Sequence, residues 1–164
     1  MENLIWAIGL WALVFVLIPI ERLKEIWPVA VVGIIWQFIM NYMMIEGGYY
    51  RFNSWIVIIA GVPLFHLIGG AGGSILLLNW MKRNPLYNVI LVLFFSGLLL
   101  LSESIMIRYG AFQYTNGFNS FLSYLQNVAG LSILVWLSLA LVGQEKIHGG
   151  NKTRFFRKLP FTGE

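Results

Sequence analysis

Two titratable side chains, Glu103 and His66, are the leading candidates for chemistry because each lies inside a long apolar stretch of the 164-residue chain. Placing a carboxylate inside a membrane costs about 2.5 to 3.5 kcal/mol on insertion scales, so such a residue is expected to have a structural or functional role. Glu103 could carry a proton, anchor a ligand, or accept hydrogen bonds from a neighbouring helix. His66 could relay a proton near neutral pH, although a hydrogen bond between helices is the preferred interpretation. Both are candidate catalytic residues if they meet, which the sequence does not decide.

A run of small residues follows His66, and a proline precedes it. Gly69 and Gly73 are four residues apart, a spacing that lets two helix backbones approach closely, and we prefer this packing interpretation. The alternative is a broken helix whose free amides line a ligand site, as in transporters with discontinuous helices. The residues assigned to helix packing or to a helix break are Pro63, Gly69, Gly70, Gly72 and Gly73.

The elements that must position these groups are membrane-spanning helices. The chain is 59% hydrophobic and 11% charged, whereas an ordinary soluble domain is about 25% charged. Its apolar runs approach or exceed the ~20 residues that a helix needs to cross a bilayer. The sequence therefore predicts an all-α, polytopic transmembrane helical bundle over residues 1–142. Its five predicted spans cover about 3–20, 29–45, 54–80, 89–107 and 120–142.

The distribution of positive charge predicts the orientation of this bundle. With five spans, every lysine and arginine except Arg51 and Arg108 falls on one side of the membrane. Cytoplasmic loops carry an excess of such residues, so we expect the N-terminus outside and the C-terminus inside. The expected location is the bacterial plasma membrane, as a multi-pass protein. Residues 143–164 then form a basic cytoplasmic tail, which we expect to be flexible.

In this topology most polar residues of the spans lie in the outer half of the membrane. At a rise of about 1.5 Å per residue, they lie roughly 6 to 18 Å below the outer surface. An unpaired polar group in hydrocarbon costs several kcal/mol, so these side chains should face one another or water. We expect an outward-opening polar pocket for a small ligand or a partner helix. Its predicted lining residues are Asn41, His66, Glu103, Gln126 and Asn127.

Composition also argues against several classes of site. The chain has no cysteine, no aspartate and two histidines, so we expect no metal site and no cofactor. Its net charge of +4 is concentrated in the tail, which indicates attraction to anionic lipid headgroups rather than binding to nucleic acid. Basic residues surround two aromatic ones at positions 152–158 and fit such a surface. A tail that is merely solvated and sets the topology is the alternative.

Four stretches together carry a family resemblance: ERLKEIWP at 21–28, PLFHLIGG at 63–70, LLLNWMKRNPLY at 76–87 and ESIMIRYGAFQY at 103–114. In their order and spacing the chain resembles an uncharacterised family of small multi-pass integral membrane proteins from endospore-forming bacteria. The resemblance implies a plasma-membrane protein of a Gram-positive type of cell. It supplies no activity and no functional residues.

Three classes of function remain open at this point. The preferred one is a non-enzymatic accessory, assembly or sensor component whose pocket binds a small ligand or a partner helix. The second is an oligomeric transporter of small solutes that uses a helix break at 69–73. The third is an intramembrane enzyme acting on a lipid or isoprenoid through Glu103 and His66. The expected partners are the lipid bilayer and either a membrane protein or a second copy of the chain.

Overall fold

The protein is mostly helical, with two short two-stranded sheets added. The computed structural model describes residues 2–53, 56–150 and 152–154. Its helices are α1 (Glu2–Leu17), α2 (Ile20–Ile26), α3 (Pro28–Glu46), α4 (Leu64–Trp80), α5 (Pro85–Arg108), α6 (Ser120–Leu141) and α7 (Gln144–His148). Its strands are β1 (Tyr50–Phe52), β2 (Ile58–Ile59), β3 (Val62–Pro63) and β4 (Phe112–Tyr114).

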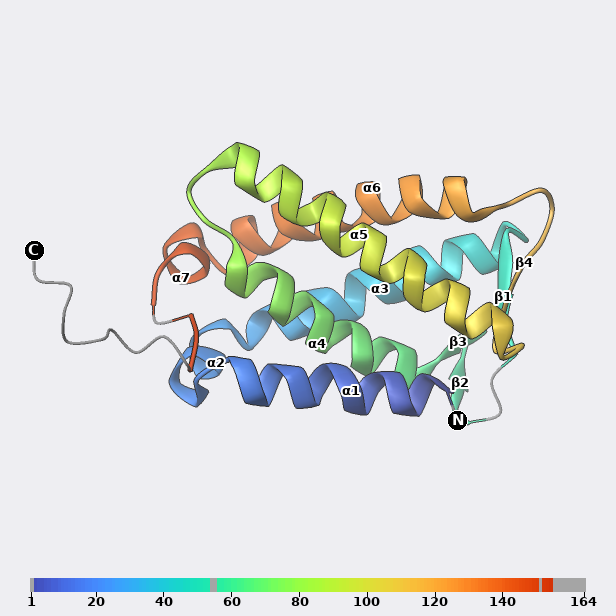
Figure 1. Cartoon of the computed structure of the whole chain (residues 1–164), viewed down its shortest axis with the longest axis horizontal. Helices are drawn as coiled ribbons and strands as arrows, with labels where there is room; N and C mark the ends of the chain where they lie inside the picture. The colour runs from blue at the N-terminus through green and yellow to red at the C-terminus, as the bar shows by residue number, and fades with distance from the viewer. Residues whose placement is uncertain (1, 54–55, 151, 155–164) are drawn as a thin grey trace, which may run out of the picture.

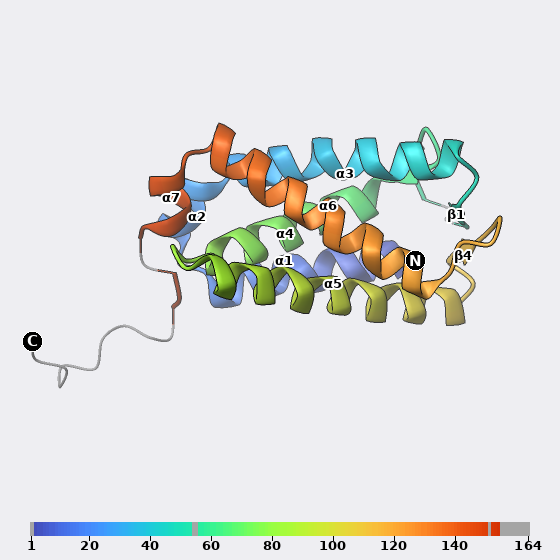
Figure 2. The ribbon, with the colours of Figure 1, turned by 90° about the horizontal axis from the view of Figure 1, so that it is seen from above.

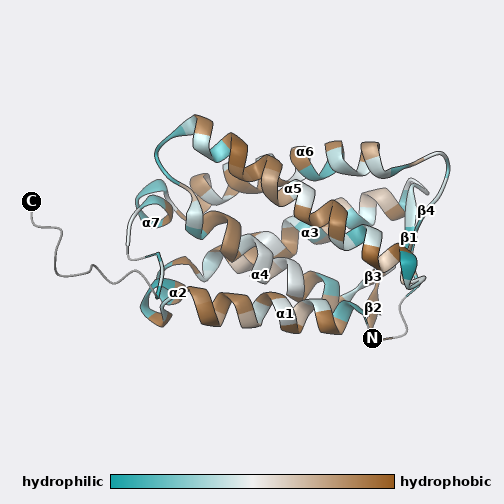
Figure 3. Cartoon of the chain, viewed as in Figure 1, coloured by the Kyte–Doolittle hydropathy of each residue, from teal (hydrophilic) through white to brown (hydrophobic). Residues whose placement is uncertain are grey.

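Among the described residues, the three helices α3, α5 and α6 are long and apolar enough to cross a membrane. A fourth crossing is available if α1 and α2 count as one span, although they meet at a bend of 116°. Proline explains this bend, because Pro19 has no amide hydrogen and disfavours helical geometry in the residue before it. Hydrophobic residues cover the long helices, and hydrophilic ones collect at the two ends (Figure 3). This is the pattern of a membrane protein.

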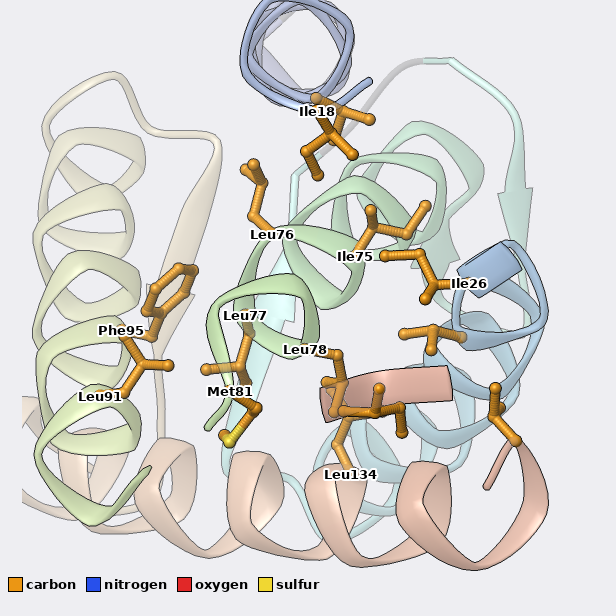
Figure 4. Packing of buried hydrophobic residues seen from close by; sticks show 14 of the residues in the cluster. Ile18, Ile26, Ile75, Leu76, Leu77, Leu78, Met81, Leu91, Phe95 and Leu134 are labelled. Atoms are coloured by element: carbon orange, nitrogen blue, oxygen red, sulfur yellow. The ribbon is translucent and has the colours of Figure 1, made fainter. Parts of the chain in front are cut away.

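The five longest helices lie side by side and alternate in direction along the long axis (Figures 1 and 2). The N-terminus and the strands lie at one end, the strand end, whereas α2 and α7 lie at the other, the α7 end. Helix α4 occupies the centre, with α1, α3, α5 and α6 arranged around it (Figure 4). Its neighbours α1 and α3 pack along much of its length, and α5 pairs mainly with α6.

The predicted span at 54–80 is wrong as a single helix, because α4 begins only at Leu64. The chain before it forms a tight antiparallel hairpin in which Ile59 pairs with Val62. Ala60 and Gly61 turn this hairpin with positive φ angles of 48° and 80°, a conformation that suits glycine. Pro63 is extended at the N-cap of α4. An apolar count along the sequence does not detect this turn, since every residue in it is apolar.

The glycine run lies inside α4, which continues through it without a break. The broken-helix alternative is therefore wrong, and the run brings neighbouring helices close. A Cβ added at Gly69 would lie 2.8 Å from Trp6 of α1, and one at Gly70 would lie 1.5 Å from the Gln37 Oε1 atom of α3. Gly72 also faces α1.

The main apolar core lies toward the α7 end, around the second half of α4. Side chains from all seven described helices, α1 to α7, meet there (Figure 4). The fully buried members include Ile18, Ile26, Ile75, Leu77, Leu78, Met81 and Ile147. This packing fixes the helices at the α7 end.

The tail is only partly as predicted. Instead of a flexible segment from residue 143 onward, Gln144–His148 forms α7, and Ile147 is completely buried. Arg22, which is 2% exposed, donates hydrogen bonds to the carbonyl oxygens of Lys146 and Ile147. The buried guanidinium thus caps the last carbonyl groups of α7 and holds this segment against the bundle. Residues 155–164, with most of the basic and aromatic stretch, lie outside the described residues.

Candidate functional site

A cavity of about 450 Å³ lies between α1, α3, α4, α5 and α6. All five residues predicted for the polar pocket line it, and Gln37 joins them. The remaining lining is almost entirely apolar and extends toward the α7 end, as far as Leu17, Leu76, Trp80 and Leu134. The cavity is therefore amphipathic, with hydrogen-bonding groups at its strand end and hydrocarbon beyond them.

Glu103 is the most strongly held polar residue of the cavity. Its Oε2 atom accepts a hydrogen bond of 2.7 Å from the Tyr114 hydroxyl of β4 and another from the Ser123 hydroxyl of α6. Its Oε1 atom accepts one of 2.9 Å from the Asn127 amide, one turn further along α6. All three partners are donors, which suits a carboxylate acceptor. The side chain thus joins three separate elements at one point.

A second hydrogen-bond chain enters the cavity from α3. The Tyr50 hydroxyl of β1 donates to the Asn41 Oδ1 atom at 2.7 Å, and the Asn41 amide donates to the Gln37 backbone carbonyl at 2.7 Å. Burial raises the pKa of Tyr50 well above its usual range, so its hydroxyl stays neutral. Burial also raises the pKa of Tyr114 to about 12. Both tyrosines therefore remain donors over the whole physiological range.

Three buried atoms of cavity-lining side chains have no hydrogen-bond partner among the described residues: Gln37 Oε1, His66 Nδ1 and Gln126 Oε1. Buried polar atoms are almost always paired in native proteins, because leaving one unpaired costs about 1 to 3 kcal/mol. Unpaired atoms that gather around one cavity indicate that water or a ligand completes them.

His66 and Glu103 line the same cavity but do not form a pair. The His66 ring packs on Phe52, with the ring centroids 4.8 Å apart, and within the described chain no hydrogen bond joins it to Glu103. A catalytic acid or base needs its partner within hydrogen-bond reach. The geometry thus gives the two residues separate positions rather than a catalytic dyad.

The strand end of the cavity is covered by aromatic side chains, which does not fit an outward-opening pocket. Strands β1 and β4 pair antiparallel, with Tyr50 opposite Tyr114 and Phe52 opposite Phe112. The rings of Tyr50, Phe52 and Phe112 contact one another, with centroids 4.9 to 5.8 Å apart. Tyr50 and Phe112 are buried. This aromatic cover separates the polar groups from the space beyond the strands.

The cavity instead approaches the side of the bundle between α1 and α5. These two helices make almost no contact, because α1 packs on α4 and α5 packs mainly on α6. Of the residues that line the cavity, Leu13 of α1 is 49% exposed, and Phe94 and Leu98 of α5 are 57% and 43% exposed. Apolar residues that both line the cavity and reach the outer surface mark a lateral opening, here called the α1–α5 opening.

Several site residues escaped the sequence analysis. Tyr114 and Ser123 bind Glu103, and Tyr50 binds Asn41. The two tyrosines lie in connections between helices, and the pairing of their strands joins residues at least 60 positions apart. Gln37 shares a helix face with Asn41, and this i, i+4 spacing was the one available signal for it. Within the described residues, no group of three or more His, Cys, Asp or Glu side chains is placed to hold a metal ion.

Comparison with known proteins adds no family to this geometry. No protein-family model, no curated protein and no solved structure matches the chain. The resemblance to small membrane proteins of endospore-forming bacteria therefore stays a prediction. The long apolar helices α3, α5 and α6 support a helical membrane protein, and the amphipathic cavity is its candidate site.

Proposed function

We propose that this protein is a non-enzymatic accessory or sensor component of the bacterial plasma membrane that binds an amphiphilic molecule dissolved in the bilayer. The observation that carries the proposal is the cavity itself, whose lining is mostly apolar but includes Glu103, Asn41, His66, Gln126 and Asn127 toward one end. A ligand with a polar head and a hydrocarbon body matches this division. The unpaired atoms of Gln37, His66 and Gln126 favour a bound polar group within the cavity.

The route of entry supports a ligand from the membrane rather than from water. The α1–α5 opening is lined by leucine and phenylalanine, whereas aromatic rings cover the strand end. A water-soluble solute would have to pass this cover. An amphiphile already in the bilayer would meet the opening by lateral diffusion.

The proposed topology has five crossings, made by α1, α3, α4, α5 and α6, with the N-terminus outside. Helix α4 has 17 residues and spans about 26 Å, close to the ~30 Å hydrocarbon core. The two cations at the strand end, Arg51 and Arg108, are far outnumbered by those at the α7 end, so the α7 end faces the cytoplasm. Anionic headgroups would then meet the exposed cations of that end, such as Arg83.

The enzyme and transporter alternatives have weaker support. No hydrogen bond joins His66 to Glu103 among the described residues, and α4 is continuous through the glycine run. A membrane-protein partner or a second copy of the chain would fit an accessory or sensor role, because signalling requires that ligand binding be passed on.

A cavity-filling substitution tests the proposal. Gly73 lines the cavity, and a Cβ added there meets only the Leu10 Cδ1 atom at 3.9 Å. Gly73→Leu should fill the space and abolish photolabelling by a long-chain alcohol that carries a diazirine. Gly97→Leu is the matched control, because Gly97 of α5 has open space around it and does not line the cavity. Equal labelling of the wild type and the Gly73→Leu variant in lipid nanodiscs would contradict the proposal.

A further inference from the structure

We propose that the polar end of the cavity selects amphiphiles with a positively charged head, that is, single-chain organic ammonium compounds. This inference rests on the proposed function and adds the chemical class of the ligand. Its physical basis is a carboxylate without a cationic partner, set beside a group of aromatic rings.

Among the described residues that line the cavity, Glu103 is the only acidic one, and none is a lysine or arginine. Its three hydrogen-bond partners, Tyr114, Ser123 and Asn127, are neutral donors. Over the described part of the chain, the two ion pairs are Arg22–Glu25 and Arg83–Glu145, both at the α7 end. The carboxylate therefore has hydrogen bonds but no counter-ion. Charges attract far more strongly in a poorly solvated site than in water, so a cation would gain most from this position.

Aromatic rings line the same end of the cavity. They belong to Trp6, Tyr50, Phe52 and Phe112. The faces of such rings attract ammonium groups, and the attraction strengthens when the cation is desolvated. Neither a phosphate nor a carboxylate head would gain from these faces, and each would be repelled by Glu103. The Glu103 carboxylate and the aromatic rings thus both favour a positively charged head.

The size of the cavity restricts the hydrocarbon part of the ligand. Pockets of roughly 300 to 1,000 Å³ hold drug-sized molecules, and this one, at about 450 Å³, is too small for a whole two-chain phospholipid. From Glu103 the apolar walls continue to Leu76 and Leu134, on the central and α6 helices (Figure 4). A single alkyl chain fits this path, with its head at the strand end.

A series of twelve-carbon probes tests the charge preference directly. Dodecyltrimethylammonium, 1-dodecanol and dodecanesulfonate share one chain and carry a positive, neutral and negative head. Each is used to displace a brominated dodecyltrimethylammonium that quenches tryptophan fluorescence, in nanodiscs of uncharged lipid, with concentrations expressed as mole fractions in the bilayer. We expect the cation to bind at least tenfold more tightly than the alcohol and the sulfonate to bind least.

Two variants assign the preference to one side chain. Glu103→Gln should remove the advantage of the cation while 1-dodecanol still binds. Glu46→Gln is the matched control, because it removes an exposed carboxylate at the same end of the bundle and outside the cavity, and it should leave the series unchanged.

The outcomes separate this inference from the proposed function. Equal binding of all three probes by the wild type, or a cation preference that survives in Glu103→Gln, would overturn the charge preference and leave the amphiphile site standing. Failure of every probe to bind the wild type would overturn both. The comparison of the three head groups uses the wild type alone, so it does not depend on whether a variant folds.

Discussion

Replacing Glu103 should weaken the bundle at a defined place, where α5, α6 and β4 meet. Glu103→Ala removes the shared acceptor of Tyr114, Ser123 and Asn127. We expect the free energy of unfolding to fall markedly, because three donors lose their partner in one step. Ser123 is only 3% exposed, so its hydroxyl has little access to solvent as a substitute.

The magnitude follows from the hydrogen bonds that are lost. Hydrogen bonds between membrane helices contribute about 0.6 kcal/mol on average and up to about 1.7 kcal/mol. Three such bonds give an expected loss of about 2 to 5 kcal/mol for Glu103→Ala. Glu103→Gln should lower the free energy of unfolding by only about 1 kcal/mol. The new amide oxygen can keep the two hydrogen bonds made at the Oε2 position, and the Asn127 side-chain amide can flip.

The assay is reversible unfolding by sodium dodecyl sulfate in mixed micelles, followed by tryptophan fluorescence. Ser104→Ala serves as the control, since Ser104 is exposed and its hydroxyl donates only to the Leu100 carbonyl of its own helix. A loss for Glu103→Ala no larger than that for Ser104→Ala would refute the role of Glu103 as the junction of three elements.

Three further predictions concern other parts of the fold. Gly33→Ala should cost about 1 to 3 kcal/mol in the same unfolding assay, because the new Cβ would lie 2.8 Å from the Ser74 Cβ atom; Gly97→Ala, with open space around it, should be neutral or stabilising by up to about 1 kcal/mol. Arg22→Lys keeps the charge but loses the planar fork that binds two carbonyls, so trypsin should cleave the C-terminal segment sooner than in the wild type; equal cleavage rates would contradict this. Burial raises the pKa of Tyr114 from its usual 10 to about 12, so the ionised form is disfavoured in the folded state and stability should fall between pH 10 and pH 12; a fluorescence-monitored pH series should show a shallower fall for Tyr114→Phe, and identical slopes would count against the shift.

The helices and the identity of the pocket residues could be predicted because both depend on local patterns. Apolar run lengths place α3, α5 and α6 within a few residues. Counting residues from the membrane surface puts Asn41, His66 and Glu103 in the outer half of the predicted bilayer, and all three line one cavity. The depth of a residue in the bilayer follows from its position along its helix, so it can be predicted from the sequence.

The features that escaped prediction depend on contacts between distant segments. The hairpin before Leu64 is built from apolar residues, so its turn is hidden in a hydrophobic stretch. The bond from Tyr114 to Glu103 depends on the pairing of β4 with β1. Arg22 looks like a topological signal in the sequence, yet it is buried by a segment 125 positions away. The side on which the cavity opens follows from which helices pack together, and no local pattern encodes that.

The most direct test of the amphiphile site is to locate the chain of a bound molecule. A dodecyltrimethylammonium analogue with a diazirine at its chain end, photolysed in nanodiscs, would label the protein where that end lies, and peptide mass spectrometry would identify the residues. We expect labels at Leu76 and Leu134, which are 3% and 4% exposed and line the apolar part of the cavity. Labels confined to exposed residues on the outer surface, such as Leu86 and Leu141, would contradict the account.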